Sequence, residues 1–129
     1  MIRMRSILIL LLCFSLVSCA PVAFVAGTAA GVGGYKYYEG ALTVIYQASY
    51  QKTWDASLKA LEEMSIRITS KQLDITSGGI MAIEASGRTM KIFLKYISPQ
   101  ETEVTIRVGL FGDEDASKII KDKIASILF

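Results

Sequence analysis

Few side chains in this sequence could take part in catalysis or bind a metal. The 129-residue chain contains no histidine, and its two cysteines, Cys13 and Cys19, lie near the N-terminus. A Ser–His or Cys–His nucleophile system and a Cys/His metal site both need residues that are absent after Cys19. The sequence therefore offers no thiol or imidazole chemistry over most of its length.

Carboxylates remain, either as a pair for glycoside hydrolysis or as calcium ligands. The acidic trio Asp113–Asp115 lacks the spaced ligands of a calcium loop. The other candidates, Glu62, Glu63, Glu101 and Glu103, lie at expected helix ends, turns and exposed strand positions, where solvation or capping accounts for them. We therefore predict that the protein is not an enzyme and holds no metal and no cofactor.

Cys19 follows a segment with the three parts of a secretory signal. Arg3 and Arg5 supply positive charge, and residues 7–17, ILILLLCFSLV, form an uncharged apolar run. The residues that follow complete the tetrapeptide LVSC, which resembles the lipobox of bacterial lipoproteins, Leu-(small or aliphatic)-(Ser, Ala or Gly)-Cys, at every position. The resemblance implies cleavage between Ser18 and Cys19 and a diacylglycerol on the Cys19 thiol. An ordinary buried cysteine in an uncleaved helix is the alternative.

On the lipoprotein interpretation, residues 1–18 are a signal peptide and the acylated Cys19 holds the chain in a lipid bilayer. Two or three acyl chains suffice for a stable anchor. Ala20, rather than an aspartate, follows Cys19. By resemblance to Gram-negative lipoproteins this implies the outer membrane, with the protein facing the periplasm; in a Gram-positive source it would be the outer leaflet of the plasma membrane.

Charge then argues against a nucleic-acid partner. The chain has 14 Lys and Arg against 12 Asp and Glu, and the signal peptide removes Arg3 and Arg5 but no acid. The mature chain is therefore balanced at 12 against 12, without the excess of positive charge that nucleic-acid binding needs.

Residues 19–40 are expected to form a Gly/Ala-rich, membrane-proximal tether. Residues 22–34 carry no charge, and Gly27 and Gly31 have the small-xxx-small spacing that lets helices approach closely in lipid. Such a segment either lies in or dips into the bilayer or serves as a flexible spacer.

The hydrophobic pattern changes near residue 41 and predicts a globular α+β domain over residues 41–129. Alternating apolar residues indicate strands, and a 3.6-residue period indicates helices. Strands are expected at residues 42–49, 66–69, 79–86, 89–97 and 103–111, with one helix at 50–64 and a second that the acidic trio opens. This order, β-α-β-β-β-β-α, predicts a five-stranded antiparallel sheet with two helices packed on one face.

Turn lengths decide which residues of this sheet face the core. A two-residue turn at residues 86–87 would place Met81 opposite Ile92 on the core side. On the outer face the apolar exceptions would be Ile80 and Phe93, among Lys91, Lys95 and Arg107. Between the last two strands, an odd number of unpaired residues, 99–101 or 98–102, keeps both apolar sets on the core face.

The lipobox, tether and element order together resemble an uncharacterised family of short bacterial lipoproteins that is labelled only as a domain of unknown function. The resemblance rests on Gly-Gly-Tyr at 33–35, the helix start at Ser49–Trp54, and the runs at 106–109 and 111–113. It implies the architecture and lends no catalytic residues.

Two classes of function remain open. In one, the domain is a non-catalytic interaction or structural module of the cell envelope that contacts a protein partner. In the other, it carries or senses a small apolar ligand between the sheet and the C-terminal helix. Methionine adapts to irregular cavities, and the lining of such a space would include Met81, Met90, Ile92 and Ile124.

Overall fold

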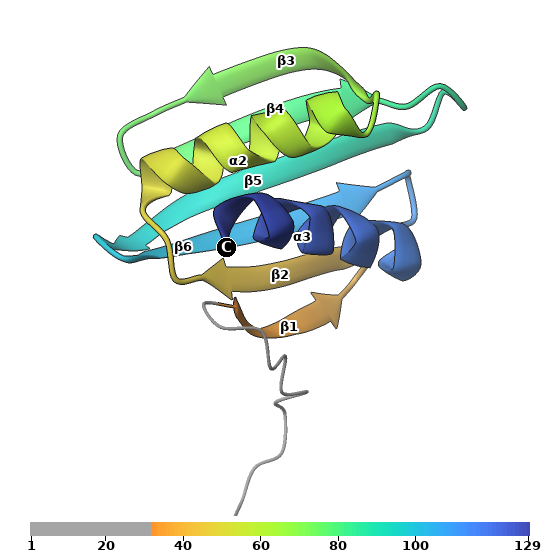
Figure 1. The fold of residues 1–129 in the computed structure, drawn as a ribbon. Coiled ribbons are helices and arrows are strands. Elements are labelled where there is room, and N and C mark those ends of the chain that lie inside the picture. The colour runs from red at the N-terminus through yellow and green to blue at the C-terminus, as the bar shows by residue number, and fades with distance from the viewer. Residues whose placement is uncertain (1–31) are drawn as a thin grey trace, which may run out of the picture.

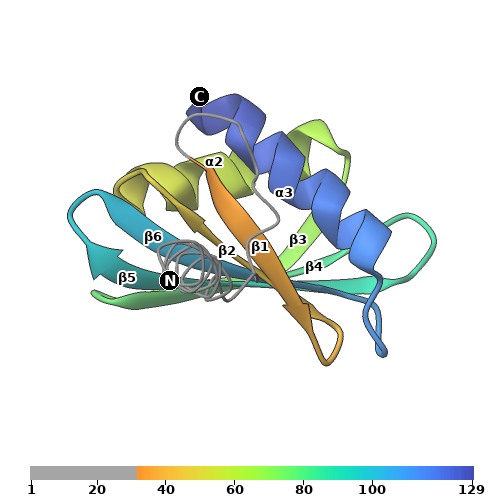
Figure 2. The same cartoon turned by 90° about the horizontal axis from the view of Figure 1, so that it is seen from below.

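The computed structural model describes residues 32–129, which form an antiparallel sheet with two helices on one face (Figure 1). The elements follow in the order β1 (Val32–Tyr38), β2 (Ala41–Tyr46), α2 (Tyr50–Glu63), β3 (Arg67–Leu73), β4 (Ser77–Ile83), β5 (Thr89–Ser98), β6 (Glu101–Val108) and α3 (Glu114–Leu128). In space the strand order is β1-β2-β6-β5-β4-β3. Turning the molecule shows that α2 and α3 lie on the same side of the sheet (Figure 2). The predicted α+β class is confirmed.

The sheet has six strands rather than the five that we predicted, because β1 lies in the stretch assigned to the tether. Glu39 and Gly40 join β1 to β2, and both have positive φ angles, 50° and 82°. Two such residues between paired strands are the signature of a type I′ hairpin turn. The order within the chain is therefore β-β-α-β-β-β-β-α, with β1 at one edge of the sheet.

Side-chain caps fix where the two helices begin. The Ser49 hydroxyl accepts a hydrogen bond from the Lys52 amide at 3.3 Å, as its position before α2 predicts. Asp113 caps α3 by accepting from the Ala116 amide at 3.0 Å. Glu114 and Asp115 then occupy the first turn of α3, where negative charge stabilises the helix dipole.

The core fills the space between the sheet and the helices. Its fully buried side chains include Leu61 of α2, Ile120 and Ile124 of α3, and Ile92 and Ile106 of the central strands. Tyr46 is also fully buried, and its hydroxyl donates to the Lys121 carbonyl at 2.8 Å. Burial raises the pKa of this phenol, with a smaller contribution from the nearby carboxylate of Asp122. The bond ties the end of β2 to the middle of α3.

The predicted face of β4 is wrong. A three-residue turn, residues 85–87, replaces the expected two-residue turn, because Glu84 and Arg88 pair across it and Gly87 takes a φ of +87°. The extra residue shifts the register by one, so that Ile80, not Met81, lies opposite Ile92. Ile80 is therefore buried and Met81 faces solvent.

The apolar residues of β5 and β6 share the core face as predicted, but the turn that joins the two strands differs from the predicted one. Leu94 lies opposite Val104, as the core faces of the two strands require. The turn itself has two residues, 99–100, and not the predicted odd number. A β-bulge at Ile97 supplies the extra residue, which keeps both apolar sets on the core side.

Candidate functional site

The face of the sheet opposite α2 and α3 is covered by no other element of residues 32–129 (Figure 2), and alternation along the strands decides which residues it presents. On β5 the core takes Met90, Ile92 and Leu94, and the outer face takes Lys91, Phe93 and Lys95. Met81 of β4 and Ile45 of β2 also point outward and are exposed. We call Met81, Lys91, Phe93 and Lys95 the outer patch.

The Phe93 ring is the largest apolar group at the centre of this face, and it is 50% exposed. It lies over Gly79, the residue opposite it on β4, where an added Cβ would stand 3.5 Å from Cε1 of the ring. A glycine in a strand leaves room for such a close neighbour. The small residue beneath the ring thus allows an aromatic side chain to lie along the sheet rather than stand away from it.

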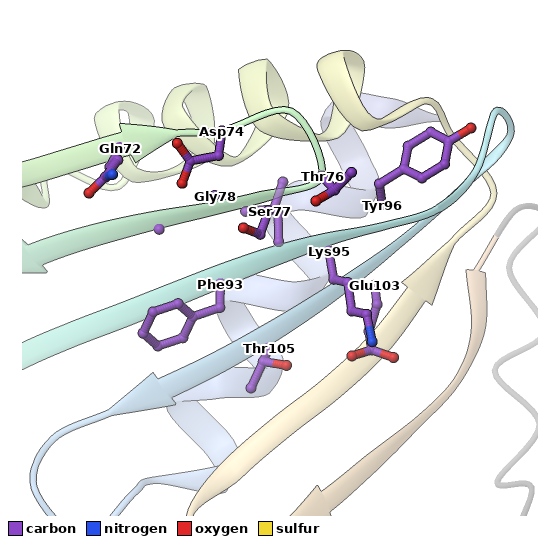
Figure 3. A pocket seen from close by; sticks show the side chains of 12 residues that line it. Gln72, Asp74, Thr76, Ser77, Gly78, Phe93, Lys95, Tyr96, Glu103 and Thr105 are labelled. Carbon is purple, nitrogen blue, oxygen red and sulfur yellow. The ribbon is translucent and has the colours of Figure 1, made fainter.

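Two hollows on the outer face meet at Glu103, which lines both. The first has a volume of about 570 Å³, and Figure 3 shows its lining from β3 to β6, which includes Gln72, Asp74, Phe93, Lys95, Tyr96 and Thr105. The second, about 620 Å³, extends over β1 and β2 to Lys36, Tyr38, Thr43 and Ile45. Small polar side chains form the floor, where the hydroxyls of Thr43 and Thr105 lie 3.4 Å apart. Together the hollows form a trough across the strands.

Charge on this face is unevenly distributed, although the described domain as a whole is balanced. Five basic residues occupy outward positions on the strands: Lys36, Arg67, Lys91, Lys95 and Arg107. The acids at outward strand positions are Glu103 and Glu101, the first residue of β6. Lys91 and Lys95 flank Phe93 along β5, so the outer patch combines an exposed ring with two cations. Such a surface suits an apolar group that carries negative charge beside it.

Arg107, also on this face, is held by backbone carbonyls. Its guanidinium donates to the Glu39 carbonyl at 2.9 Å and to the Leu110 carbonyl at 2.7 Å. These bonds join the β1–β2 turn to the loop before α3. Arg107 therefore has a structural role, and Lys91 and Lys95 are the cations beside the ring that are exposed to solvent.

A second charged cluster lies at the end of the sheet where α3 begins. Arg88 pairs with Glu84 and, at 2.7 Å, with Asp113. The hydrogen bond from Arg88 lowers the pKa of Glu84. The pKa of Asp113 is lowered mainly by the hydrogen bond from the Ala116 amide and then by the one from Arg88. The bonds that Arg88 makes to these two carboxylates raise its own pKa. The cluster fixes the β4–β5 turn against the start of α3.

The structure separates the four residues that we predicted to line a ligand space. Met90, Ile92 and Ile124 are buried in the core, whereas Met81 is 39% exposed on the opposite face of the sheet. The four cannot line one cavity. Met90 alone borders a hollow, of about 330 Å³, beside Met64, Ile66 and Ile119. Ser18 and Cys19 lie outside the described residues.

Within residues 32–129, no three or more acidic, cysteine or histidine side chains gather as metal ligands would. No helix in this part of the chain has the length and apolar character needed to cross a membrane.

From the sequence we predicted Phe93, Lys91 and Lys95 on the outer face of the sheet, but we did not predict the trough. Glu103, Tyr96 and Gln72 come together only through the six-strand register. The available signal was the run of small residues at 77–79, which leaves one side of β4 nearly flat.

Comparison with known proteins places the chain in a family. Residues 4–126 match the family described as "Protein of unknown function (DUF3568)". The chain belongs to this family. The match confirms the resemblance to a domain of unknown function, while the lipoprotein features stay a prediction from residues 16–19. No curated protein matches the sequence significantly.

Proposed function

We propose that this family member is a lipid-anchored, non-catalytic interaction or structural module of the cell envelope, and that it binds its partner through the outer face of the sheet. On this proposal Cys19 carries the lipid, and the domain faces the periplasm from the outer membrane. The supporting sequence observation is the four-residue match to a lipobox behind an apolar run of signal-peptide length.

The observation that carries the choice of surface is the exposed aromatic ring in a hollowed, uncovered sheet face. Phe93 and Met81 are exposed to solvent and do not pack in the core, and two cations flank the Phe93 ring. Hot spots of protein interfaces combine an aromatic or cationic side chain with a pocket in this way. The trough, whose lining comes from both edges and the centre of the sheet, gives this face a concave shape that a partner can fit.

The alternative, a carrier of an apolar ligand, has less support. Ile92 and Ile124 are fully buried, and neither lines the hollow beside Met64 and Met90 or the two hollows of the outer face. The apolar hollow beside Met64 and Met90 lies at one end of the domain next to the Arg88 cluster. A ligand in that hollow would bind independently of the outer patch.

Charge reversal on the outer face tests the proposal. The double variant Lys91→Glu/Lys95→Glu should lose the proteins that co-purify with the chain after crosslinking in intact cells. Lys52→Glu/Lys59→Glu is the matched control, because both lysines are exposed on α2 and the change in net charge is the same. Equal losses from both variants, or none from either, would contradict a partner on the outer face.

Lipid attachment is tested separately at Cys19. Cys19→Ser should leave an unprocessed precursor without acyl chains, while the wild-type chain should partition into detergent with an acylated mass. An unmodified Cys19 in the mature protein would refute this part of the proposal.

A further inference from the structure

The loop between β6 and α3 presents two large apolar side chains to solvent. Leu110 is 79% exposed and Phe111 is 87% exposed, and they are consecutive. We call this pair the loop tip. Single exposed apolar residues are common on protein surfaces, but two together at a loop apex form an apolar projection without a partner in the described domain.

The backbone that carries the loop tip is held in place from several sides. Arg107 donates to the Leu110 carbonyl, and the Gly109 amide donates to the Thr89 carbonyl at 2.7 Å. Gly112 lies against Gly40, so closely that a Cβ at residue 112 would stand 2.3 Å from the Gly40 Cα. Ordering this loop therefore costs little when it binds, which is how preorganised loops gain affinity.

Exposed acidic residues lie near the loop tip, whose backbone Arg107 holds from the side of the sheet. Glu39 lies in the adjoining turn, and Glu114 and Asp115 follow in the first turn of α3; all three are exposed. An anionic membrane would repel such a projection. Its complement is a hollowed surface with an exposed ring and cations, and the outer patch is such a surface.

We infer that the loop tip of one copy docks on the outer patch of a second copy, with the apolar pair against Phe93 and Met81 and the acids of the first copy near Lys91 and Lys95. The inference rests on the proposed function and names the partner as another copy of this chain. Because the two surfaces differ, the contact is head to tail and leaves a free loop tip at one end and a free patch at the other. Such contacts build open chains rather than closed dimers.

The contact area limits the strength of this association. Two side chains and their neighbours bury far less than the roughly 800 Å² per partner of a stable interface, so we expect weak association in dilute solution. Copies anchored in one membrane meet at a high effective concentration, which favours weak contacts. The test therefore uses the full chain in its own membrane.

Residues 32–129 contain no cysteine, so single cysteines can report the contact. Two differently tagged full-length copies are expressed together, one with Leu110→Cys and the other with Met81→Cys, and a disulfide is formed by mild oxidation. We expect a mixed dimer from this pair and none from two copies of Leu110→Cys or two copies of Met81→Cys. Chains that carry both cysteines should give a ladder of dimers, trimers and longer species.

Controls separate docking from random collision. Ser126→Cys, on the exposed side of α3, should not crosslink to Met81→Cys, and the wild-type chain should give no disulfide. Phe111→Ala should lower the yield of the mixed dimer about tenfold or more, the effect of removing a buried ring from a contact. Ile119→Ala is the matched control, because Ile119 is also apolar and exposed but lies on α3, and this variant should leave the yield unchanged.

The absence of a mixed dimer would overturn the inference, as would equal crosslinking from position 126 or disulfides between two Leu110→Cys copies. If this contact fails while charge reversal of the outer face still releases another envelope protein, the proposed function stands and only self-docking is refuted. If both fail, the outer face is not the binding surface.

Discussion

Two neighbouring glycines of β4 should respond in opposite ways to the same substitution. Gly78 faces the helices, where an added Cβ would stand 2.8 Å from Cζ3 of Trp54 and 3.2 Å from Cδ1 of Leu73. Gly79 faces outward, where the nearest atom would be 3.5 Å away on the Phe93 ring, an ordinary contact. Gly78→Ala therefore crowds the core, and Gly79→Ala does not.

The free energies follow from these distances. Replacing a strand glycine by alanine gains about 0.5–1 kcal/mol by reducing the freedom of the unfolded chain. This gain is common to both variants. Overpacking against the buried Trp54 costs about 1–3 kcal/mol. Gly79→Ala should therefore be neutral or slightly stabilising, and Gly78→Ala should be about 1–3 kcal/mol less stable than Gly79→Ala.

Thermal unfolding of a chain that begins at residue 32 measures the difference. In a domain of this size each kcal/mol shifts Tm by about 4–8 °C. The register that we predicted from sequence would instead direct residue 79 inward, with Met81. A lower Tm for Gly79→Ala than for Gly78→Ala would therefore refute the β4 register on which the outer patch depends.

Two further predictions concern stability. A chain of residues 32–129 should melt cooperatively, whereas residues 41–129, the predicted extent of the globular domain, should be about 2 kcal/mol or more less stable. That fragment loses the pairing of β1 with β2 and its two half-buried tyrosines; equal Tm values would contradict this. The free energy of unfolding should also fall as the pH drops from about 5 to 3. The two carboxylate partners of Arg88 have lowered pKa values in the folded state, so their contribution is present above their ordinary pKa and lost as they protonate. Arg88→Met should weaken this pH dependence in urea titrations, and an unchanged slope would count against the ion cluster.

Strong local signals explain what could be predicted from the sequence. Ser49 precedes an amphipathic segment and caps α2 as expected, and the acidic trio opens the last helix as expected, with Asp113 as its cap. The core faces of β5 and β6 were also correct. Val104 and Ile106 alternate with polar residues, and Ile92 and Leu94 alternate with Lys91 and Lys95, with Phe93 as the apolar exception between them. These features depend on residues close together in the chain.

The errors arose where one residue of turn length or an unusual turn decides the outcome. Ser86-Gly87 resembles a two-residue turn, but the Glu84–Arg88 pair closes a longer one, and a shift of one residue turns the whole of β4 over. Glu39-Gly40 turns β1 back onto β2 although β1 begins with a Gly-rich stretch typical of a linker. The trough depends on both corrections, since its lining comes from β1 to β6.

A photoreactive amino acid placed at position 93 tests the central claim most directly, because it reports what touches the outer face in the intact envelope. We predict that it captures a defined protein species, a second copy of this chain included, and that the same group at position 119 on α3, which is 60% exposed, captures none. No capture from position 93, or the same products from both positions, would contradict the account of the outer sheet face as the binding surface.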